Sequence, residues 1–325
     1  MHRTLKLLAA GLATLALTAE ANAPAKPQWP EKPVRIVVPF GLASFPDIVA
    51  RVVGQKLSEG LGQPVVIENK PGAGGNIGTE AVVRAKPDGY TLLLHTVANA
   101  INASLYRSLP FDASKDLVPV SQIASVSNVL VVPTALPVNS LKELIELART
   151  SRRGLTFASG GNGTTAHLAG QLFKTMAQVK VEHVPYSNFG QALTDVMGGQ
   201  PDFIIPNIPP TVAHIQGGKF RAIAVTGVKR SALLPEVPTF AEAGLSGYEV
   251  SSWNGLAAPA GTPPEVIARL HIEVVRALKD SEVVKKLTAQ GAEIVGSTPA
   301  AYAALIHAET TKWRGVVRDA GALVD

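Results

Sequence analysis

Three turns in this sequence carry residue types that can bind a small anion. Residues 41–47, 160–165 and 188–191 contain glycine, serine, threonine or asparagine, and each precedes a helical pattern. The start of a helix exposes backbone N–H groups that have no partner within the helix, and the helix dipole is positive there. A carboxylate binds well at such a position. Together the turns predict a carboxylate site, although each turn taken singly is also what an ordinary capped helix requires.

The sequence lacks the common motifs of hydrolases, nucleotide-binding enzymes and metalloenzymes. It has no Gly-x-Ser-x-Gly elbow, no P-loop and no His-Glu-x-x-His motif. The seven histidines are not spaced as metal ligands, and the chain has no cysteine. A hydrolase stays an alternative, for which Ser44 and His95 are the nucleophile and base to consider. We otherwise expect no catalytic residue, no metal and no cofactor.

A glycine-rich segment at residues 72–78 resembles the fingerprint of a dinucleotide site only in part. Its third glycine falls one position late, and the segment follows the second predicted strand rather than the first. We therefore expect a structural turn there and no nucleotide site.

β-branched runs alternate with helical patterns along most of the chain, which is typical of parallel α/β sheets. Strands are predicted at residues 34–38, 64–68, 90–95, 128–132, 155–158, 180–184, 203–205, 222–226 and 249–257. Only helices follow the last strand, so the C-terminal part cannot build a third sheet. We expect lobe I to contain residues 27–125 and 248–325, and lobe II to contain residues 126–247. Two strands would cross between the lobes, with a ligand cleft at the carboxyl ends of the strands.

The first 23 residues have the layout of a secretory signal peptide. A short basic head is followed by an apolar run at residues 7–17 and by small residues at Ala19, Ala21 and Ala23. The apolar run is too short for a membrane-spanning helix, so we expect the protein in the periplasm. The net charge is +5 and the basic residues form no stripe, which favours anionic ligands and gives no support for nucleic-acid binding.

Many short segments, in the same order along the chain, are similar to those of a known family. They are residues 29–40, 65–78, 87–93, 110–112, 161–163, 167–168, 183–186, 192–195, 234–239 and 257–263. On these segments the chain resembles the Bug (Bordetella uptake gene) family, the TctC-type receptors of tripartite tricarboxylate transporters. The resemblance implies a type II periplasmic-binding-protein fold that closes on a small carboxylate, and a membrane permease as the partner that receives it.

The resemblance also implies which residues contact the ligand. Family contacts come from the turn after the first strand, the segment after the third strand and the loops of lobe II. At these positions the sequence has Phe40, Ala43, Ser44, Phe45, Asp47, His95, Thr96, Gly161, Asn162, Thr164, Thr165, Tyr186, Asn188, Phe189 and Asn207. We expect a monomer. A periplasmic sensor that signals to a partner protein has the same sequence features and stays an alternative to transport.

The turns depart from the family pattern where they would meet a ligand. Ala43 and Ser44 replace paired glycines in the first turn, and Phe45 follows them. A second glycine pair is replaced by a segment that ends in Phe189, and Pro206 stands where an aspartate is common. We hypothesise that Phe45 and Phe189 face each other across the cleft, so that the ligand has an aromatic or apolar body with one or two carboxylates. The other possibility is that one or both rings pack away from the cleft.

Overall fold

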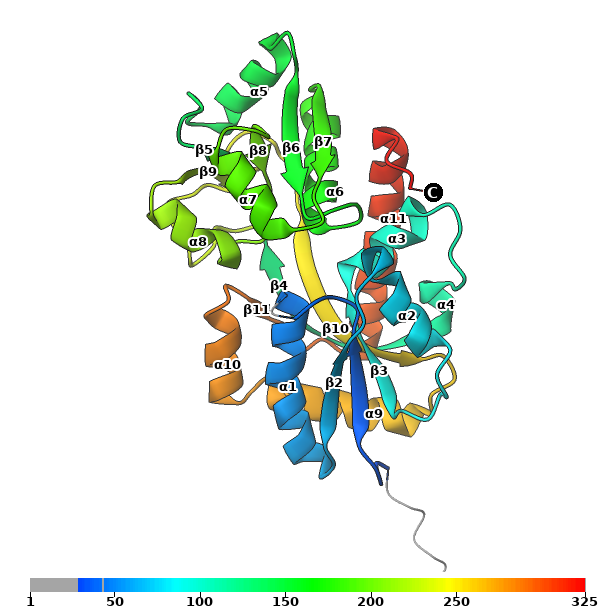
Figure 1. Ribbon diagram of the computed structural model, residues 1–325. Coiled ribbons are helices and arrows are strands. Elements are labelled where there is room, and N and C mark those ends of the chain that lie inside the picture. Colours follow the sequence, from blue (N-terminus) through cyan, green and yellow to red (C-terminus); the bar gives the residue numbers. More distant parts are fainter. Residues whose placement is uncertain (1–28, 43, 325) are drawn as a thin grey trace, which may run out of the picture.

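Two mixed sheets, each with helices packed around it, build the two lobes of the molecule (Figure 1). The computed structural model describes residues 29–42 and 44–324, so the expected signal peptide and Ala43 lie outside the described residues. Across the described residues, no helix combines the length and the apolar character that a membrane span needs. The two-lobed α/β fold expected from the sequence is confirmed. The residue boundaries that we assign to the lobes stay a prediction.

The sheet of lobe I has the strand order β11-β4-β10-β3-β1-β2 in the described part of the chain. Its strands are β1 (Val34–Val38), β2 (Val65–Asn69), β3 (Thr91–Thr96), β4 (Leu117–Ser127), β10 (Ser251–Pro259) and β11 (Glu293–Ile294). Its helices are α1 (Phe45–Leu61), η1 (Ala73–Gly75), α2 (Asn76–Val83), α3 (Val97–Leu105), α4 (Ala113–Asp116), α9 (Pro264–Ala277), α10 (Ser281–Thr288) and α11 (Pro299–Ala320). β1 is parallel to β2 and β3, whereas β10 is antiparallel to β3 and β4. The carboxyl ends of β1 and β3 therefore meet at the edge of this sheet that faces lobe II.

The sheet of lobe II has the order β7-β6-β8-β5-β9 among the described residues. Its strands are β5 (Val129–Pro133), β6 (Leu155–Ser159), β7 (Val181–Pro185), β8 (Phe203–Ile204) and β9 (Phe220–Val225). Its helices are α5 (Leu141–Thr150), α6 (Thr165–Ala177), α7 (Phe189–Met197) and α8 (Pro209–Gln216). β6 is parallel to β7 and β8, so the starts of α6 and α7 lie at the same edge of the sheet.

The chain crosses between the lobes after β4 and again before β10. The Asn128 N–H group donates to Thr226 Oγ1 at 2.9 Å, and the Thr226 hydroxyl donates to the Val250 carbonyl at 2.5 Å. Asn128 and Thr226 are fully buried. Thr226 therefore ties together the two segments through which the lobes are connected.

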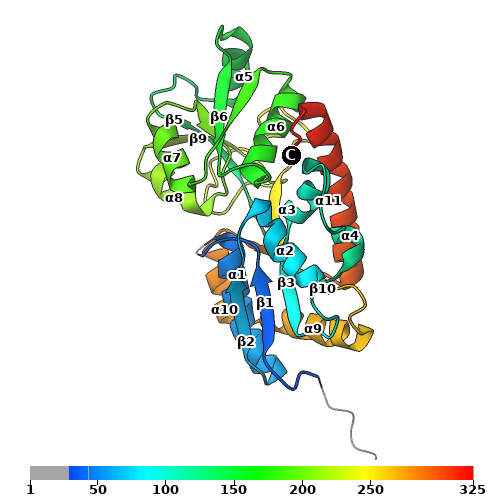
Figure 2. The same cartoon turned by 45° about the vertical axis from the view of Figure 1, so that its right-hand side comes forward.

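Helix α11 joins the lobes beside the crossing strands (Figure 2). It packs against α3 of lobe I and α6 of lobe II. Its Trp313 belongs to one apolar cluster with Ile101 of α3 and Phe173 of α6. Glu309 of the same helix accepts hydrogen bonds from the indole N–H groups of Trp253 in β10 (3.2 Å) and Trp313 (2.9 Å). The two lobes thus share part of their core on the side of α11.

Candidate functional site

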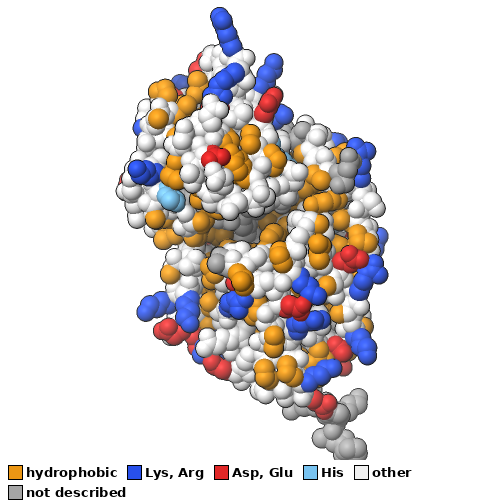
Figure 3. All heavy atoms as spheres, viewed as in Figure 1, with side chains coloured by type: hydrophobic (Ala, Val, Ile, Leu, Met, Phe, Trp, Pro, Cys, Tyr) orange, Lys and Arg blue, Asp and Glu red, His pale blue; other side chains and the backbone are white. Residues whose placement is uncertain are grey.

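A cavity of about 590 Å³ lies between the lobes. In Figure 3 the molecular surface is hollowed where the two lobes meet. The described lining residues are Phe40, Gly41, Leu42, Ser44, Phe45, Pro46, Ile48, Thr96, Val97, Ala98, Gly160, Gly163, Thr164, Thr165, Ala166, Phe189, Pro206, Asn207, Pro209, Pro210, Ser252, Trp253, Asn254 and Gln290. Both lobes and the crossing strand β10 contribute to this wall, and the volume suits a small organic ligand.

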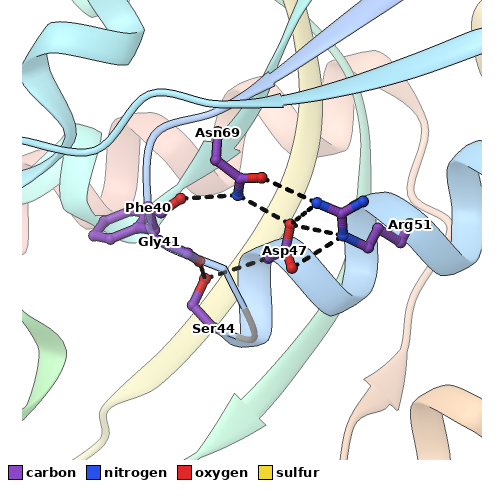
Figure 4. Close-up of polar contacts among 6 residues, drawn as sticks. All are labelled: Phe40, Gly41, Ser44, Asp47, Arg51 and Asn69. Atoms are coloured by element: carbon purple, nitrogen blue, oxygen red, sulfur yellow. Dashed lines mark hydrogen bonds and ion pairs between the residues drawn. The ribbon is translucent and has the colours of Figure 1, made fainter.

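A buried carboxylate holds the turn between β1 and α1 (Figure 4). Asp47 is 3% exposed, and its carboxylate accepts hydrogen bonds from Arg51 Nε at 3.0 Å and from Asn69 Nδ2 at 2.9 Å. Asn69 Nδ2 also donates to the Phe40 carbonyl at 3.0 Å. The network connects α1 to the end of β2 and fixes the backbone from which the Phe40 ring reaches the cavity.

Ser44 caps α1 in the same turn. Its hydroxyl donates to the Gly41 carbonyl at 2.7 Å and accepts the N–H of Asp47 at 3.4 Å. Phe45 and Pro46 are the first helical residues, and both line the cavity. Pro46 has no N–H group, so the start of α1 offers a ligand fewer donors than most helix starts do.

The turn between β6 and α6 has the same capped geometry without a charged group. The Thr164 hydroxyl donates to the Gly161 carbonyl at 2.8 Å and accepts the N–H of His167 at 3.3 Å. The His167 ring stacks on His183 of β7 with 4.1 Å between ring centroids, and His183 Nε2 is hydrogen-bonded to Ser159 Oγ at 2.6 Å. Burial lowers the pKa of His167 to about 3 and the pKa of His183 to about 4. Both rings are therefore neutral near pH 7.

Polar side chains gather around β10 in what we name the β10 patch, which consists of Thr96, Thr165, Asn207, Ser252 and Asn254. The Ser252 hydroxyl donates to Thr165 Oγ1 at 2.8 Å and accepts from Asn207 Nδ2 at 2.7 Å. Thr96 is the cross-strand partner of Asn254, so the two side chains lie on the same face of the sheet. Asn254 is 1% exposed, and its Oδ1 atom has no hydrogen-bond partner among the described residues. The patch connects the lobes and leaves one buried amide oxygen that could accept a hydrogen bond only from an N–H or O–H group of a ligand.

Helices α1, α3, α6, α7 and α8 begin at the cavity. The first turns of these helices contribute the lining residues Phe45, Pro46, Ile48, Val97, Ala98, Thr165, Ala166, Phe189, Pro209 and Pro210. None of the described lining residues is ionisable, so backbone N–H groups, hydroxyls and helix dipoles must balance the charge of a ligand. Within the described ranges there is also no group of three or more histidine, aspartate or glutamate side chains that could hold a metal ion.

The structure brings about half of the expected contact residues to the cavity. Those that line it are Phe40, Ser44, Phe45, Thr96, Thr164, Thr165, Phe189 and Asn207. Phe45 and Phe189 thus line one cavity from opposite lobes. Whether these residues contact the ligand stays a prediction.

The remaining expected residues, apart from Ala43, do not line the cavity. They are Asp47, His95, Gly161, Asn162, Tyr186 and Asn188. Asp47 and Gly161 form the hydrogen bonds of the turns described above. Asn188 caps α7, because its Oδ1 accepts the N–H of Gln191 at 3.2 Å, and Tyr186 packs against the apolar cluster of lobe II.

His95 points away from the cleft because side chains alternate between the two faces of a strand. Its Nδ1 atom lies within hydrogen-bond distance of the Tyr302 hydroxyl of α11, at 3.0 Å, and burial lowers its pKa to about 3. It lines a different cavity of about 320 Å³ beside α11, together with Arg314. The Ser44–His95 pair that a hydrolase would need is therefore not formed.

Sequence reasoning missed the part of the site that β10 provides. The side chains of Ser252 and Asn254 lie two residues apart in an otherwise mostly apolar strand that we expected to cross between the lobes. A buried asparagine in a central strand requires hydrogen-bond partners, and this is a signal that could have identified the strand as part of a polar site. Gln290 was also missed, and we find no comparable signal for it.

The fold and the cavity define a class of protein, a two-lobed receptor that encloses a small solute between its lobes. Within this class the chain belongs to the tripartite tricarboxylate transporter family of receptors, whose model matches residues 49–322. The resemblance stated from the sequence is confirmed. Members of this family are periplasmic solute-binding receptors and not enzymes, and the chain is not an enzyme.

Individual relatives match over nearly the whole chain. The chain is 37% identical to Protein BugT of Bordetella pertussis (strain Tohama I) over 324 residues, which cover 99% of this chain and 98% of BugT. An R. palustris protein solved with adipate is 38% identical, with a TM-score of 0.81 over 90% of this chain and 98% of that protein. MatC from Rhodopseudomonas palustris, solved with bound malate, is 32% identical, with a TM-score of 0.78 over 89% of this chain and 99% of MatC.

Proposed function

We propose that this protein is an exported receptor that captures a small carboxylate with an aromatic or apolar body and delivers it to the membrane permease of a tripartite tricarboxylate-type transporter. The proposal rests mainly on the cavity between the lobes, whose uncharged wall contains several helix starts and the β10 patch. The relatives solved with adipate and malate support a carboxylate as the ligand.

Lobe closure accounts for capture because the two lobes contribute to the same wall. The Ser252–Thr165 and Ser252–Asn207 hydrogen bonds join β10 to the first residue of α6 and to the segment before α8 in lobe II. A ligand that contacts both lobes favours the closed arrangement by the difference between its affinities for the closed and open forms. Phe45 and Phe189 line the wall from different lobes, and we assign to them the apolar contacts with the body of the ligand.

A thermal-shift screen of the mature protein against aliphatic and aromatic carboxylates tests ligand capture. A ligand that binds only the folded protein raises the melting temperature by mass action. The Phe45→Ala/Phe189→Ala variant should bind the best ligand at least tenfold more weakly, with Val228→Ala as a control because Val228 is 76% exposed and does not line the cavity. Unchanged affinity in the double variant would contradict the assigned role of the two rings.

Export and delivery need separate experiments in cells. N-terminal sequencing of the protein from the periplasmic fraction should show that about the first 23 residues have been removed. Deleting the gene should abolish uptake of the labelled ligand, and restoring it should recover uptake. Normal uptake in the deletion strain would contradict delivery to a permease and would leave the sensor alternative to test.

A further inference from the structure

We infer that the ligand carries a single carboxylate, bound at the β10 patch, and that the rest of the ligand is an alkyl or aryl body. The inference rests on the proposed function and adds the number and position of the charges. It follows from the uneven distribution of hydrogen-bond donors around the cavity.

The β10 patch and the helix starts beside it provide donors that the protein does not use itself. The Thr96 hydroxyl donates to no acceptor among the described residues. The Asn254 Oδ1 atom on the opposite strand also has no partner there, but it is an acceptor and so adds no donor for a carboxylate. Helix α3 begins at Val97, directly after Thr96, and helix α6 begins at Thr165 of the patch. Both helices direct their positive dipole ends and free N–H groups toward this region. A carboxylate here can accept from the Thr96 hydroxyl and from the N–H groups of the two helix starts.

The hydroxyl groups that line the cavity outside the patch are already used. Ser44 donates to the Gly41 carbonyl at 2.7 Å, and Thr164 donates to the Gly161 carbonyl at 2.8 Å. Each hydroxyl has one proton, so neither residue keeps a donor for a ligand. Gln290 is the other polar side chain of the described wall, and one neutral amide does not balance the charge of a second carboxylate.

Prolines remove backbone donors from two other helix starts that line the cavity. Pro46 occupies the first turn of α1, and Pro209 and Pro210 are the first two residues of α8. None of them has an N–H group. The lining side chains outside the patch are mainly apolar, and they include Phe40, Leu42, Phe45, Ile48, Phe189 and Pro206. The start of α7 at Phe189 still offers backbone N–H groups, but no side-chain donor of the described wall outside the β10 patch other than Gln290 remains to assist them. A second carboxylate would therefore lose its hydration for few donors, whereas a methyl group or an aromatic ring would gain from burial.

Comparing the affinities of hexanoate and adipate tests whether a second carboxylate weakens binding. Both have six carbons, and hexanoate has a methyl group where adipate has its second carboxylate. We would measure both by titration calorimetry with the mature protein at pH 7.5, where the carboxylates are ionised. A wider panel would contain alkyl and aryl mono-, di- and tricarboxylates. We expect hexanoate to bind at least tenfold more tightly than adipate, and the tightest ligand of the panel to be a monocarboxylate.

The possible outcomes separate this inference from the proposed function. If adipate binds within tenfold of hexanoate or more tightly, or if the best ligand carries two or more carboxylates, the inference is wrong and the proposed function stands. If no carboxylate of the panel binds, the proposed function is wrong and the inference falls with it.

A pair of variants at Thr96 tests the position of the carboxylate. Thr96→Val keeps the shape of the side chain and removes the hydroxyl donor, and we expect about a tenfold loss of affinity for the best monocarboxylate. Thr96→Ser keeps the hydroxyl and should bind within threefold of the wild type. Equal affinities of the two variants would place the carboxylate away from the β10 patch. Circular dichroism and the melting temperature without ligand confirm that both variants fold.

Discussion

The turn after β1 in lobe I and the turn after β6 in lobe II share one local design. In each, a hydroxyl residue caps the helix, donates to the carbonyl of a glycine three residues earlier and accepts an N–H three residues later. The pairs of corresponding residues are Gly41 and Gly161, Ser44 and Thr164, and Asp47 and His167. Each turn follows a strand of a parallel pair, and both lead to the same cavity.

The two turns differ in the chemistry that anchors them to the sheet. Asp47 is a buried carboxylate that binds Arg51 and Asn69, whereas His167 is a neutral ring that stacks on His183 and approaches Gln171. The partners occupy corresponding positions in the two turns. Asn69 and His183 each lie on the neighbouring strand, whereas Arg51 and Gln171 each lie four residues further along the helix. The same turn geometry is therefore built on a charged anchor in lobe I and on a neutral anchor in lobe II.

The largest difference between the turns should appear on acidification. The folded pKa values of His167 and His183, about 3 and about 4, lie below the ordinary value of 6.5, so the unfolded chain binds more protons between these limits. The contribution of the two histidines to the free energy of unfolding is therefore fully present above pH 6.5 and is lost as the pH falls toward 4. The loss approaches roughly 1.4 kcal/mol per pH unit for each histidine. Urea unfolding at several pH values measures this slope.

A His167→Gln/His183→Gln variant provides the comparison for that slope. Its stability should change less between pH 6.5 and 4, while buried His95 still contributes its own dependence. A slope identical to that of the wild type would show that the histidine anchor does not control the acid sensitivity.

Removal of the charged anchor should have the next largest effect. Asp47→Asn leaves Arg51 and Asn69 without their carboxylate, and we expect a loss of about 2–3 kcal/mol in the free energy of unfolding, because breaking a buried ion pair is costly while Arg51 is half exposed. Glu80→Gln is the control, since Glu80 pairs with the exposed Arg84 and should cost less than about 0.5 kcal/mol. Equal losses in the two variants would refute the role of Asp47 as an anchor.

The corresponding glycines should respond unequally to alanine. Gly161 has a φ of 112°, where an L side chain is strained, so Gly161→Ala should cost about 1–2 kcal/mol. Gly41 does not have a positive φ, and a Cβ atom there would meet nothing within 4 Å, so Gly41→Ala should change stability by less than about 0.5 kcal/mol. Similar costs at both sites would show that the backbones of the turns are more alike than the structure indicates.

Removing the helix caps should have the smallest effect on stability, and the effect should be similar in the two turns. Ser44→Ala and Thr164→Ala each remove a hydroxyl with the same two partners, and we expect a loss of about 1 kcal/mol from either change. Chemical denaturation of the two variants at pH 7.5 measures this. A difference larger than the effect itself would mean that the turns do not share one design.

The sequence allowed the two lobes, most strands and the helix starts to be predicted, because these depend on local periodicity and capping. The elements that were not predicted include α3, whose segment contains two asparagines, β4, which is interrupted by proline and polar residues, and the short elements α4 and β11. β4 is nevertheless a central strand, because β10 and β11 pair with it from distant parts of the chain. Local propensity cannot report such pairing.

The sequence was enough to predict that both turns are capped and that a phenylalanine stands at the start of α1 and of α7. Neighbouring residues decide these features through hydrogen bonds and sterics that act within a few positions. The tertiary structure was needed to show that Thr96 faces the cavity while His95 faces α11, and that Asn254 lies opposite Thr96. Strand register sets these positions, and register depends on pairing between segments about 160 residues apart rather than on either segment alone.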